Sequence, residues 1–232
     1  MRIKVKNPTR FTLFILSILA VIFLISACRN HFLTMGDLRD SLSRNHGREN
    51  LEKKYMVVID PGHGGKDSGA IGASGRFEKD FTLSLSKKVA ERLEQEPEIG
   101  VYLTREDDSF ISTKGSLRAA FANERNADLF ISIHGNTFND PDLSGTQSFY
   151  YHDNCQAFAE VMHRHVLSAT GFIDRGVEKG NFFVLRDTHM PSVLLEIGYL
   201  TNPRDEAKML RKDFQETVAD AILMGIKEYL GL

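Results

Sequence analysis

Four side chains of types that bind metals or transfer protons stand at the ends of predicted strands or at the start of a predicted helix. They are His63, Glu78, His134 and Glu196. The apolar runs 57–59, 129–133 and 193–195 predict buried strands, which lead to His63, His134 and Glu196 in turn. Because ligands of open α/β sheets bind outside the carboxyl ends of strands, neighbouring strands would bring these residues into one pocket. Two imidazoles and one carboxylate with an open position form a catalytic zinc site.

Each of these residues also has an ordinary structural interpretation. Glu78 suits the first turn of a helix, where the helix dipole stabilises an acid, and His134 suits a hydrogen-bonded histidine at a strand edge. Glu196 is harder to explain in this way, because a carboxylate in an apolar run is costly to bury unless it is paired or used. Its structural alternative is an ion pair with an arginine such as Arg105 or Arg186.

The segment around His63 predicts a tight turn at the end of a strand. Pro61 and three glycines surround the histidine, so another group can approach the backbone closely. The alternative is a solvent-facing turn in which His63 has no chemical role. Asp60 and Asp67 are rival ligands nearby, although both are typical of strand ends and turns.

Alternating strands and helices must position these residues. We predict strands over residues 55–60, 99–104, 128–134, 145–151, 182–185 and 192–197, and helices over 81–93, 117–121, 157–167 and 214–230. Strands interleaved with crossover helices predict a single α/β domain with an open, twisted, mostly parallel or mixed sheet and helices on both faces.

The first 27 residues form a separate segment with a basic start and an apolar stretch over 11–27. We interpret residues 1–27 as a signal peptide or membrane anchor. The sequence Ser26-Ala27-Cys28 resembles the lipobox of bacterial lipoproteins, which would make Cys28 a lipidation site; an uncleaved anchor and plain secretion are the alternatives. All three place the rest of the chain outside the cytoplasm. Residues 29–54 are interpreted as a tether and 55–232 as the catalytic domain.

Charge and cysteine content exclude two further classes of protein. Removing residues 1–27 takes away four basic and no acidic residues, which moves the formal charge from −2 to about −6. Such a domain has no electrostatic attraction to nucleic acid phosphates. Two cysteines are too few for a disulfide framework, and Cys155 is expected to be a small core residue.

Six short motifs occur in one order along the chain: Ile59-Asp60-Pro61-Gly62-His63-Gly64-Gly65, Glu78-Lys79, Leu103-Thr104-Arg105, Ser132-Ile133-His134-Gly135-Asn136, Arg175-Gly176-Val177 and Leu195-Glu196-Ile197-Gly198-Tyr199-Leu200-Thr201-Asn202. Together they resemble the zinc-dependent N-acetylmuramoyl-L-alanine amidases of the amidase-3 type over about residues 55–230. Two positions depart from the family pattern: Gly135 stands where alanine is more usual, and Tyr199 where phenylalanine is more usual.

The resemblance implies a function for each of the four residues. It makes His63, Glu78 and His134 the ligands of one Zn²⁺ ion and Glu196 the catalytic carboxylate. The expected reaction is hydrolysis of the amide between the lactyl group of N-acetylmuramic acid and L-alanine in peptidoglycan. We expect a monomer held at the membrane by its N-terminal segment.

Other functions are weighed against this one. A helix with the His-Glu-x-x-His pattern of many zinc peptidases is absent from the sequence, and so are the Gly-Lys-Ser/Thr ending of a phosphate-binding loop and the close His-x-Asp/Glu pair of iron oxygenases. The non-enzymatic alternative is an anchored protein that binds peptidoglycan or activates a hydrolase without catalysis. The complete set of four residues favours the enzyme.

Overall fold

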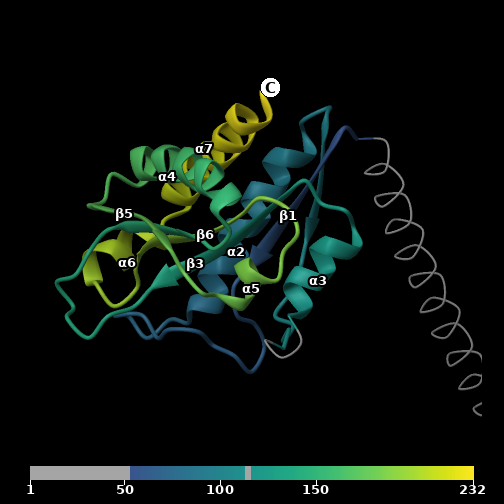
Figure 1. The fold of residues 1–232 in the computed structure, drawn as a ribbon. Helices are drawn as coiled ribbons and strands as arrows, with labels where there is room; N and C mark the ends of the chain where they lie inside the picture. Colours follow the sequence, from purple (N-terminus) through teal and green to yellow (C-terminus); the bar gives the residue numbers. More distant parts are fainter. Residues whose placement is uncertain (1–52, 113–115) are drawn as a thin grey trace, which may run out of the picture. The chain divides into compact units, whose positions relative to one another are not determined.

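One six-stranded sheet forms the centre of the computed structural model, in the strand order β2-β1-β3-β6-β4-β5 (Figure 1). Its strands are β1 (Tyr55–Pro61), β2 (Ile99–Leu103), β3 (Leu129–Asn136), β4 (Thr146–Tyr150), β5 (Asp174–Lys179) and β6 (Ser192–Tyr199). Strands β2, β1, β3 and β6 are parallel to one another. Strand β4 is antiparallel to β6 and parallel to β5. The sheet is therefore mixed, and the predicted fold class is confirmed.

The structure describes residues 53–112 and 116–232. Within them the helices are α2 (Glu78–Glu94), α3 (Leu117–Glu124), α4 (Gln156–Thr170), α5 (Phe183–Arg186), α6 (Pro203–Met209) and α7 (Lys212–Leu230), with a 3₁₀ turn η1 (Asp153–Cys155) before α4. The predicted N-terminal segment 1–27, Cys28 and nearly all of the tether lie outside the described residues.

The two faces of the sheet are covered by different helices, because successive side chains of a strand point to opposite sides. On β1, Val57 and Ile59 join the larger apolar cluster with helices α2, α4 and α7. Val58, between them, joins a smaller cluster that includes Ala122 of α3 and is flanked by Val184 of α5. The helices on both faces that the sequence predicted are thus present, and they leave the carboxyl ends of β1, β3 and β6 free for a site.

Three elements differ from the sequence prediction. Residues 182–185 were predicted as a strand, but 183–186 form the short helix α5. Strand β5 was not predicted, because its sequence Asp-Arg-Gly-Val-Glu-Lys is polar and largely exposed and so lacks an apolar period. Helix α6 was also missed, although Asn202 caps its first turn by accepting hydrogen bonds from two backbone N–H groups, and Pro203 follows as the first helical residue.

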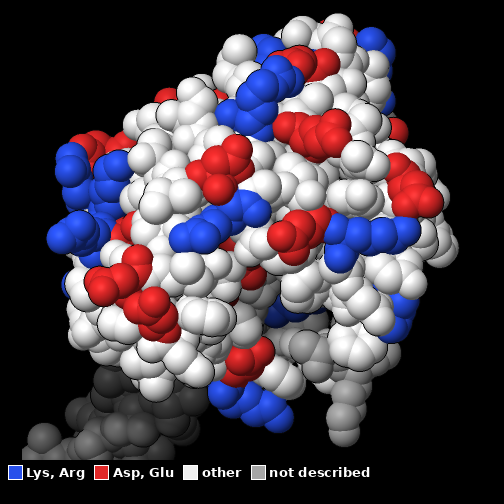
Figure 2. All heavy atoms as spheres, turned by 60° about the vertical axis from the view of Figure 1, so that its left-hand side comes forward, with Lys and Arg blue, Asp and Glu red and all other residues white. Residues whose placement is uncertain are grey.

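The surface carries charges of both signs. Figure 2 shows acidic and basic side chains interspersed across one face of the molecule.

None of the helices in residues 53–112 and 116–232 is both long and apolar enough to cross a membrane. Cys155 is buried, as expected for a small core residue.

Candidate active site

The sheet register brings the strand-end residues together. Pro61 of β1 pairs with Ile133 of β3, and His134 of β3 pairs directly with Glu196 of β6. The turn that carries His63 begins immediately after β1. Parallel strands place their carboxyl ends at one edge, so the residues converge there as the sequence predicted.

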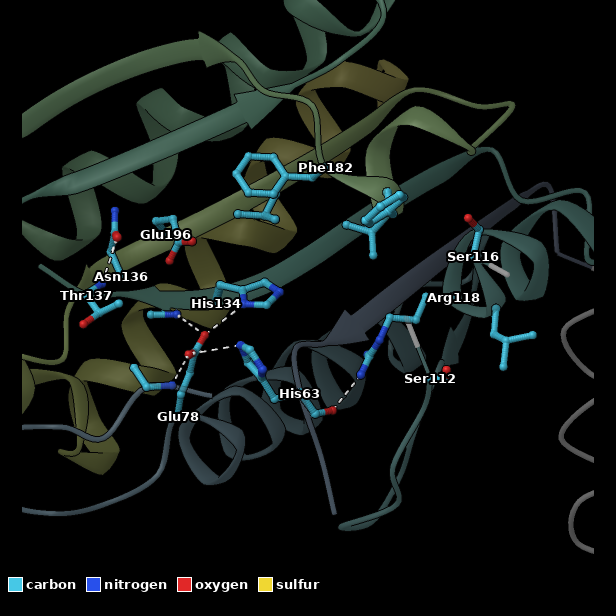
Figure 3. A pocket seen from close by; sticks show the side chains of 16 residues that line it. His63, Glu78, Ser112, Ser116, Arg118, His134, Asn136, Thr137, Phe182 and Glu196 are labelled. Atoms are coloured by element: carbon cyan, nitrogen blue, oxygen red, sulfur yellow. Dashed lines mark hydrogen bonds and ion pairs between the residues drawn. The ribbon is translucent and has the colours of Figure 1, made fainter. Parts of the chain in front are cut away.

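His63, Glu78 and His134 point toward one another at this edge (Figure 3). Glu78 Oε1 lies 2.9 Å from His134 Nδ1, and Glu78 Oε2 lies 3.1 Å from His63 Nε2. One donor atom from each of the three residues lies within 4.8 Å of the others. Two imidazoles and one carboxylate in this arrangement form a candidate metal centre.

Glu78 is the first residue of helix α2 and is nearly fully buried. Besides the two imidazoles, the backbone N–H groups of Ala70 and Gly135 donate to its carboxylate at 2.8 Å and 3.1 Å. Burial alone would raise the pKa of Glu78, but the hydrogen bonds with His134 and His63 outweigh it and hold the pKa well below its usual range. Glu78 is therefore an anion fixed at the centre of the site.

Glu196 has the opposite environment. Its Oε2 atom is buried and has no hydrogen-bond partner among the described residues. Burial raises the pKa of Glu196 to about 7. The alternative ion pairs with Arg105 or Arg186 are absent, because Arg105 donates to backbone carbonyls and Arg186 pairs with Asp187.

Two buried arginines hold the turn that presents His63. The backbone of His63 has a left-handed φ of 61°, which is uncommon outside glycine. Arg118 donates to the His63 carbonyl at 2.6 Å and to the Asp60 carboxylate at 2.5 Å. Arg105 donates to the carbonyls of Pro61 and Gly62. Asp60, a rival ligand in the sequence, is instead the buried partner of Arg118.

Asp67, the other rival ligand, lies on the far side of the His63 ring. Its Oδ1 atom is 3.0 Å from His63 Nδ1, while His63 Nε2 faces Glu78. Nδ1 is buried and has no hydrogen-bond partner among the described residues, so the contact with Asp67 is one of proximity. A carboxylate beside the second ring nitrogen is nevertheless the usual way in which a metal-binding histidine is oriented. In the sequence, the only indication that Asp67 lies beside His63 is that both belong to the same glycine-rich turn.

Glycines around the site leave room for the two imidazoles. A Cβ atom on Gly62 would lie 2.3 Å from the His134 ring, and one on Gly69 would lie 2.6 Å from Glu78 Oε2. At Gly135, where the family more often has alanine, a Cβ would lie 2.8 Å from the end of the Leu200 side chain. Gly135 therefore leaves the space that the Leu200 side chain occupies.

A cavity of about 400 Å³ opens beside these residues. The cavity is lined by His63, Glu78, His134 and Glu196, and it extends toward α3 and α5, as Figure 3 shows. Its volume suits a part of a large substrate.

A second histidine cluster lies elsewhere in the fold. His163 of α4 is within hydrogen-bonding distance of Ser148 Oγ (3.0 Å, from Nδ1) and Asp174 Oδ1 (2.9 Å, from Nε2), the same three residue types as in serine hydrolases but with the two ring nitrogens exchanged. Ser148 is fully buried, however, so a substrate has no access to its hydroxyl. The cluster joins α4 to β4 and β5.

An α/β sheet with three metal-binding donors and a buried carboxylate gathered at its strand ends and at the start of α2 is typical of metal-dependent hydrolases. A family model described as N-acetylmuramoyl-L-alanine amidase matches residues 57–228. The chain belongs to this amidase-3 family, and it is an enzyme of the peptidoglycan amidase class.

Similar proteins agree with this assignment. The catalytic domain of CwlV, an N-acetylmuramoyl-L-alanine amidase from Bacillus (Paenibacillus) polymyxa var. colistinus, is 47% identical with a TM-score of 0.74, over 76% of this chain and 98% of that domain. An N-acetylmuramoyl-L-alanine amidase from Clostridium difficile 630 is 37% identical with a TM-score of 0.74, over 78% and 98%. The probable cell wall amidase LytH of Staphylococcus aureus is 32% identical over 82% of this chain and 63% of LytH. The chain therefore spans less than two thirds of LytH.

Proposed function

We propose that this chain hydrolyses the amide between the lactyl group of N-acetylmuramic acid and L-alanine by a zinc-dependent mechanism. In this proposal His63, Glu78 and His134 are the ligands and Glu196 is the general base. The observation that carries the assignment is the buried Oε2 atom of Glu196, which has no hydrogen-bond partner among the described residues. Glu196 stands opposite His134 in the register of β3 and β6, beside the three converging donors.

The residues fit a zinc ion by the types of their donor atoms and by the negative charge of Glu78. Zinc is bound by neutral imidazoles and ionised carboxylates. Glu78 is held as an anion, and each imidazole directs one ring nitrogen at it. When bound, zinc supplies a Lewis acid that polarises the scissile carbonyl and makes the attacking water more acidic.

The chain's own residues then manage the protons. Glu196 accepts the proton of the attacking water through its free carboxylate oxygen and delivers a proton to the amine of L-alanine as it leaves. A carboxyl group whose pKa is raised to about 7 exchanges protons readily near neutral pH. Gly62 leaves room for the His134 ring, because a Cβ atom there would lie 2.3 Å from it.

The proposal includes the setting of the enzyme. Peptidoglycan lies outside the cytoplasmic membrane, so the catalytic domain acts there. We also propose that the domain acts as a monomer. Residues 1–27 direct export, and the mature protein stays at the membrane through this segment or through a lipid on Cys28.

Purified full-length protein incubated with peptidoglycan tests the function. We expect new L-alanine amino termini, their loss when a chelator removes the metal, and their return when Zn²⁺ is added. His134→Ala removes one ligand and should lower both zinc content and cleavage. His189→Ala, a change at an exposed histidine outside the site, is the matched control and should leave both unchanged. Cleavage by metal-free protein at the original rate would contradict the zinc mechanism.

A further inference from the structure

We propose that the substrate binds the cavity in one orientation. The uncharged sugar lies against the apolar wall between α3 and α5, and the stem peptide extends past Asn136 and Thr137. This inference rests on the proposed function and assigns the two arms of its substrate. Phe183 and Leu117 are the wall residues on which the assignment depends.

The geometry requires two exits from the reacting centre. The scissile amide must lie beside His134 and Glu196, so the sugar and the peptide extend from it in different directions. The cavity provides two such directions: Asn136 and Thr137 line it on one side of Glu196, and the wall of α3 and α5 lines it on the other (Figure 3).

The lining toward α3 and α5 is mainly apolar, with Ser112, Ser116 and Arg118 beside the apolar side chains. The apolar wall consists of Leu117, Phe182, Phe183, Val184 and Leu194. Phe183 and Leu117 remain 54% and 50% exposed, so much of their apolar surface is open to a ligand. Arg186 stacks on the Phe183 ring, 4.6 Å from its centroid, which helps to hold the ring in place.

Charge decides which arm this wall accepts. The stem peptide carries carboxylates, whereas N-acetylmuramic acid joined through its lactyl amide is neutral and offers C–H faces and an acetyl methyl group. Arg118 is the single lysine or arginine among the residues that line the cavity, and Asp60 and two backbone carbonyls already engage its guanidinium. Arg186, which stacks on Phe183, is paired with Asp187. A carboxylate on this wall would therefore lose hydration without gaining an unpaired counter-charge, whereas a sugar face packs well on an aromatic ring.

The opposite exit has the chemistry that a peptide needs. Asn136 and Thr137 offer an amide and a hydroxyl next to the reacting centre. The Asn136 amide nitrogen is 3.4 Å from the Gln147 side-chain oxygen, a weak contact that a peptide carbonyl can replace. Side-chain amides and hydroxyls pair with backbone groups of either polarity.

Two soluble substrates that differ only in the sugar test the assignment. These are N-acetylmuramoyl-L-alanyl-D-isoglutamine and D-lactoyl-L-alanyl-D-isoglutamine, and the measured quantity is the ratio of their kcat/KM values. We expect Phe183→Ala to lower this ratio about fivefold, the effect of losing one aromatic contact. Leu117→Ala should lower the ratio as well. Phe138→Ala, which alters an equally exposed phenylalanine outside the cavity lining, should leave it unchanged.

An unchanged ratio in Phe183→Ala, or an equal fall in Phe138→Ala, would overturn the assignment. If the wild type cleaves neither compound, the peptidoglycan assay described above decides whether the proposed function fails. Calorimetric titration with the peptide-free disaccharide of N-acetylglucosamine and N-acetylmuramic acid, its lactyl carboxyl converted to the uncharged amide, then tests the wall separately. Weaker binding by Phe183→Ala than by the wild type and by Phe138→Ala supports the assignment, and equal affinities refute it.

Discussion

The two glutamates of the cavity have pKa values that are pushed in opposite directions. Glu78 receives two backbone N–H groups and two imidazoles, which keep it ionised. Glu196 is buried without a hydrogen bond to its Oε2 atom, and its pKa rises to about 7. Pairs of titratable groups separated in this way divide the work of a site. The environment thus supports a permanent anion at Glu78 and a proton carrier at Glu196.

Replacing Glu196 by glutamine separates catalysis from folding. We expect Glu196→Gln to lower kcat by about 10²- to 10⁴-fold, because it removes general base catalysis. The variant should bind one zinc ion as the wild type does and should unfold at the same or a higher urea concentration, since a poorly satisfied buried carboxylate is removed. Steady-state kinetics, metal analysis and urea unfolding measure these effects. Glu178→Gln, at an exposed position of β5, is the control, and a Glu196→Gln enzyme with full activity would remove Glu196 from the mechanism.

The four central residues could be predicted from sequence because each follows an apolar run or begins a helix. The residues that orient them could not. Asp67 reaches the far side of His63 and Arg118 holds the His63 carbonyl, and both depend on side-chain directions in three dimensions. A polar residue in a loop and an arginine on a short helix carry no period that predicts such contacts.

At the scale of elements, the end of β1 connects stability with the site. Asp60 accepts hydrogen bonds from Thr104, Ser132 and Arg118, which belong to the segment after β2, to β3 and to α3. Arg118 then reaches past β1 to the carbonyl of His63. A single buried ion pair therefore ties two strands and a helix to the turn that carries His63.

The buried pair predicts how stability depends on pH. Burial by itself would raise the pKa of Asp60, but Arg118 and the two hydroxyl groups lower it below the ordinary 3.8. Asp60 thus stabilises the fold above about pH 3.8 and loses this contribution as the pH falls through its lower, folded-state pKa. We expect Asp60→Asn to cost roughly 3–5 kcal/mol at pH 7, because Arg118 is left buried and unpaired.

Urea unfolding between pH 2.5 and pH 7 checks this expectation. The stability difference between wild type and Asp60→Asn should shrink as the pH falls below about 3.8. Asp153→Asn, which alters a fully exposed partner of Lys179, should follow the wild type closely. A difference that stays constant down to pH 2.5 would show that Asp60 does not titrate in this way.

Most elements of the sheet could be predicted, because the buried strands β1, β3 and β6 are continuous apolar runs. The errors fall where tertiary surroundings outweigh local preference. Residues 182–185 are aromatic or aliphatic, yet residues 183–186 form the helix α5, where Val184 packs on the smaller apolar cluster. The edge strand β5 is polar and is defined by its pairing with β4.

At the scale of the whole molecule, the family match and the fold describe one catalytic domain, and we propose that the N-terminal segment sets its location. The match covers residues 57–228 and the described fold begins at residue 53. In the proposed function, the apolar segment ahead of this domain exports it, since peptidoglycan lies outside the cell membrane. We propose that the sequence Ser26-Ala27-Cys28 provides the retention of the domain at the membrane.

Intact mass of the membrane-extracted protein tests that retention. If Cys28 is lipidated, the mature chain lacks residues 1–27 and carries an acylated cysteine at its amino terminus. Such a protein stays with membranes in high salt, because its acyl chains rather than its charges hold it there. Cys28→Ala should leave the precursor uncleaved at this position, whereas Cys155→Ala, a change in the core, should leave processing intact. A wild-type mass that includes residues 1–27 would instead establish an uncleaved anchor, and recovery of a shortened, unacylated chain in the medium would establish secretion.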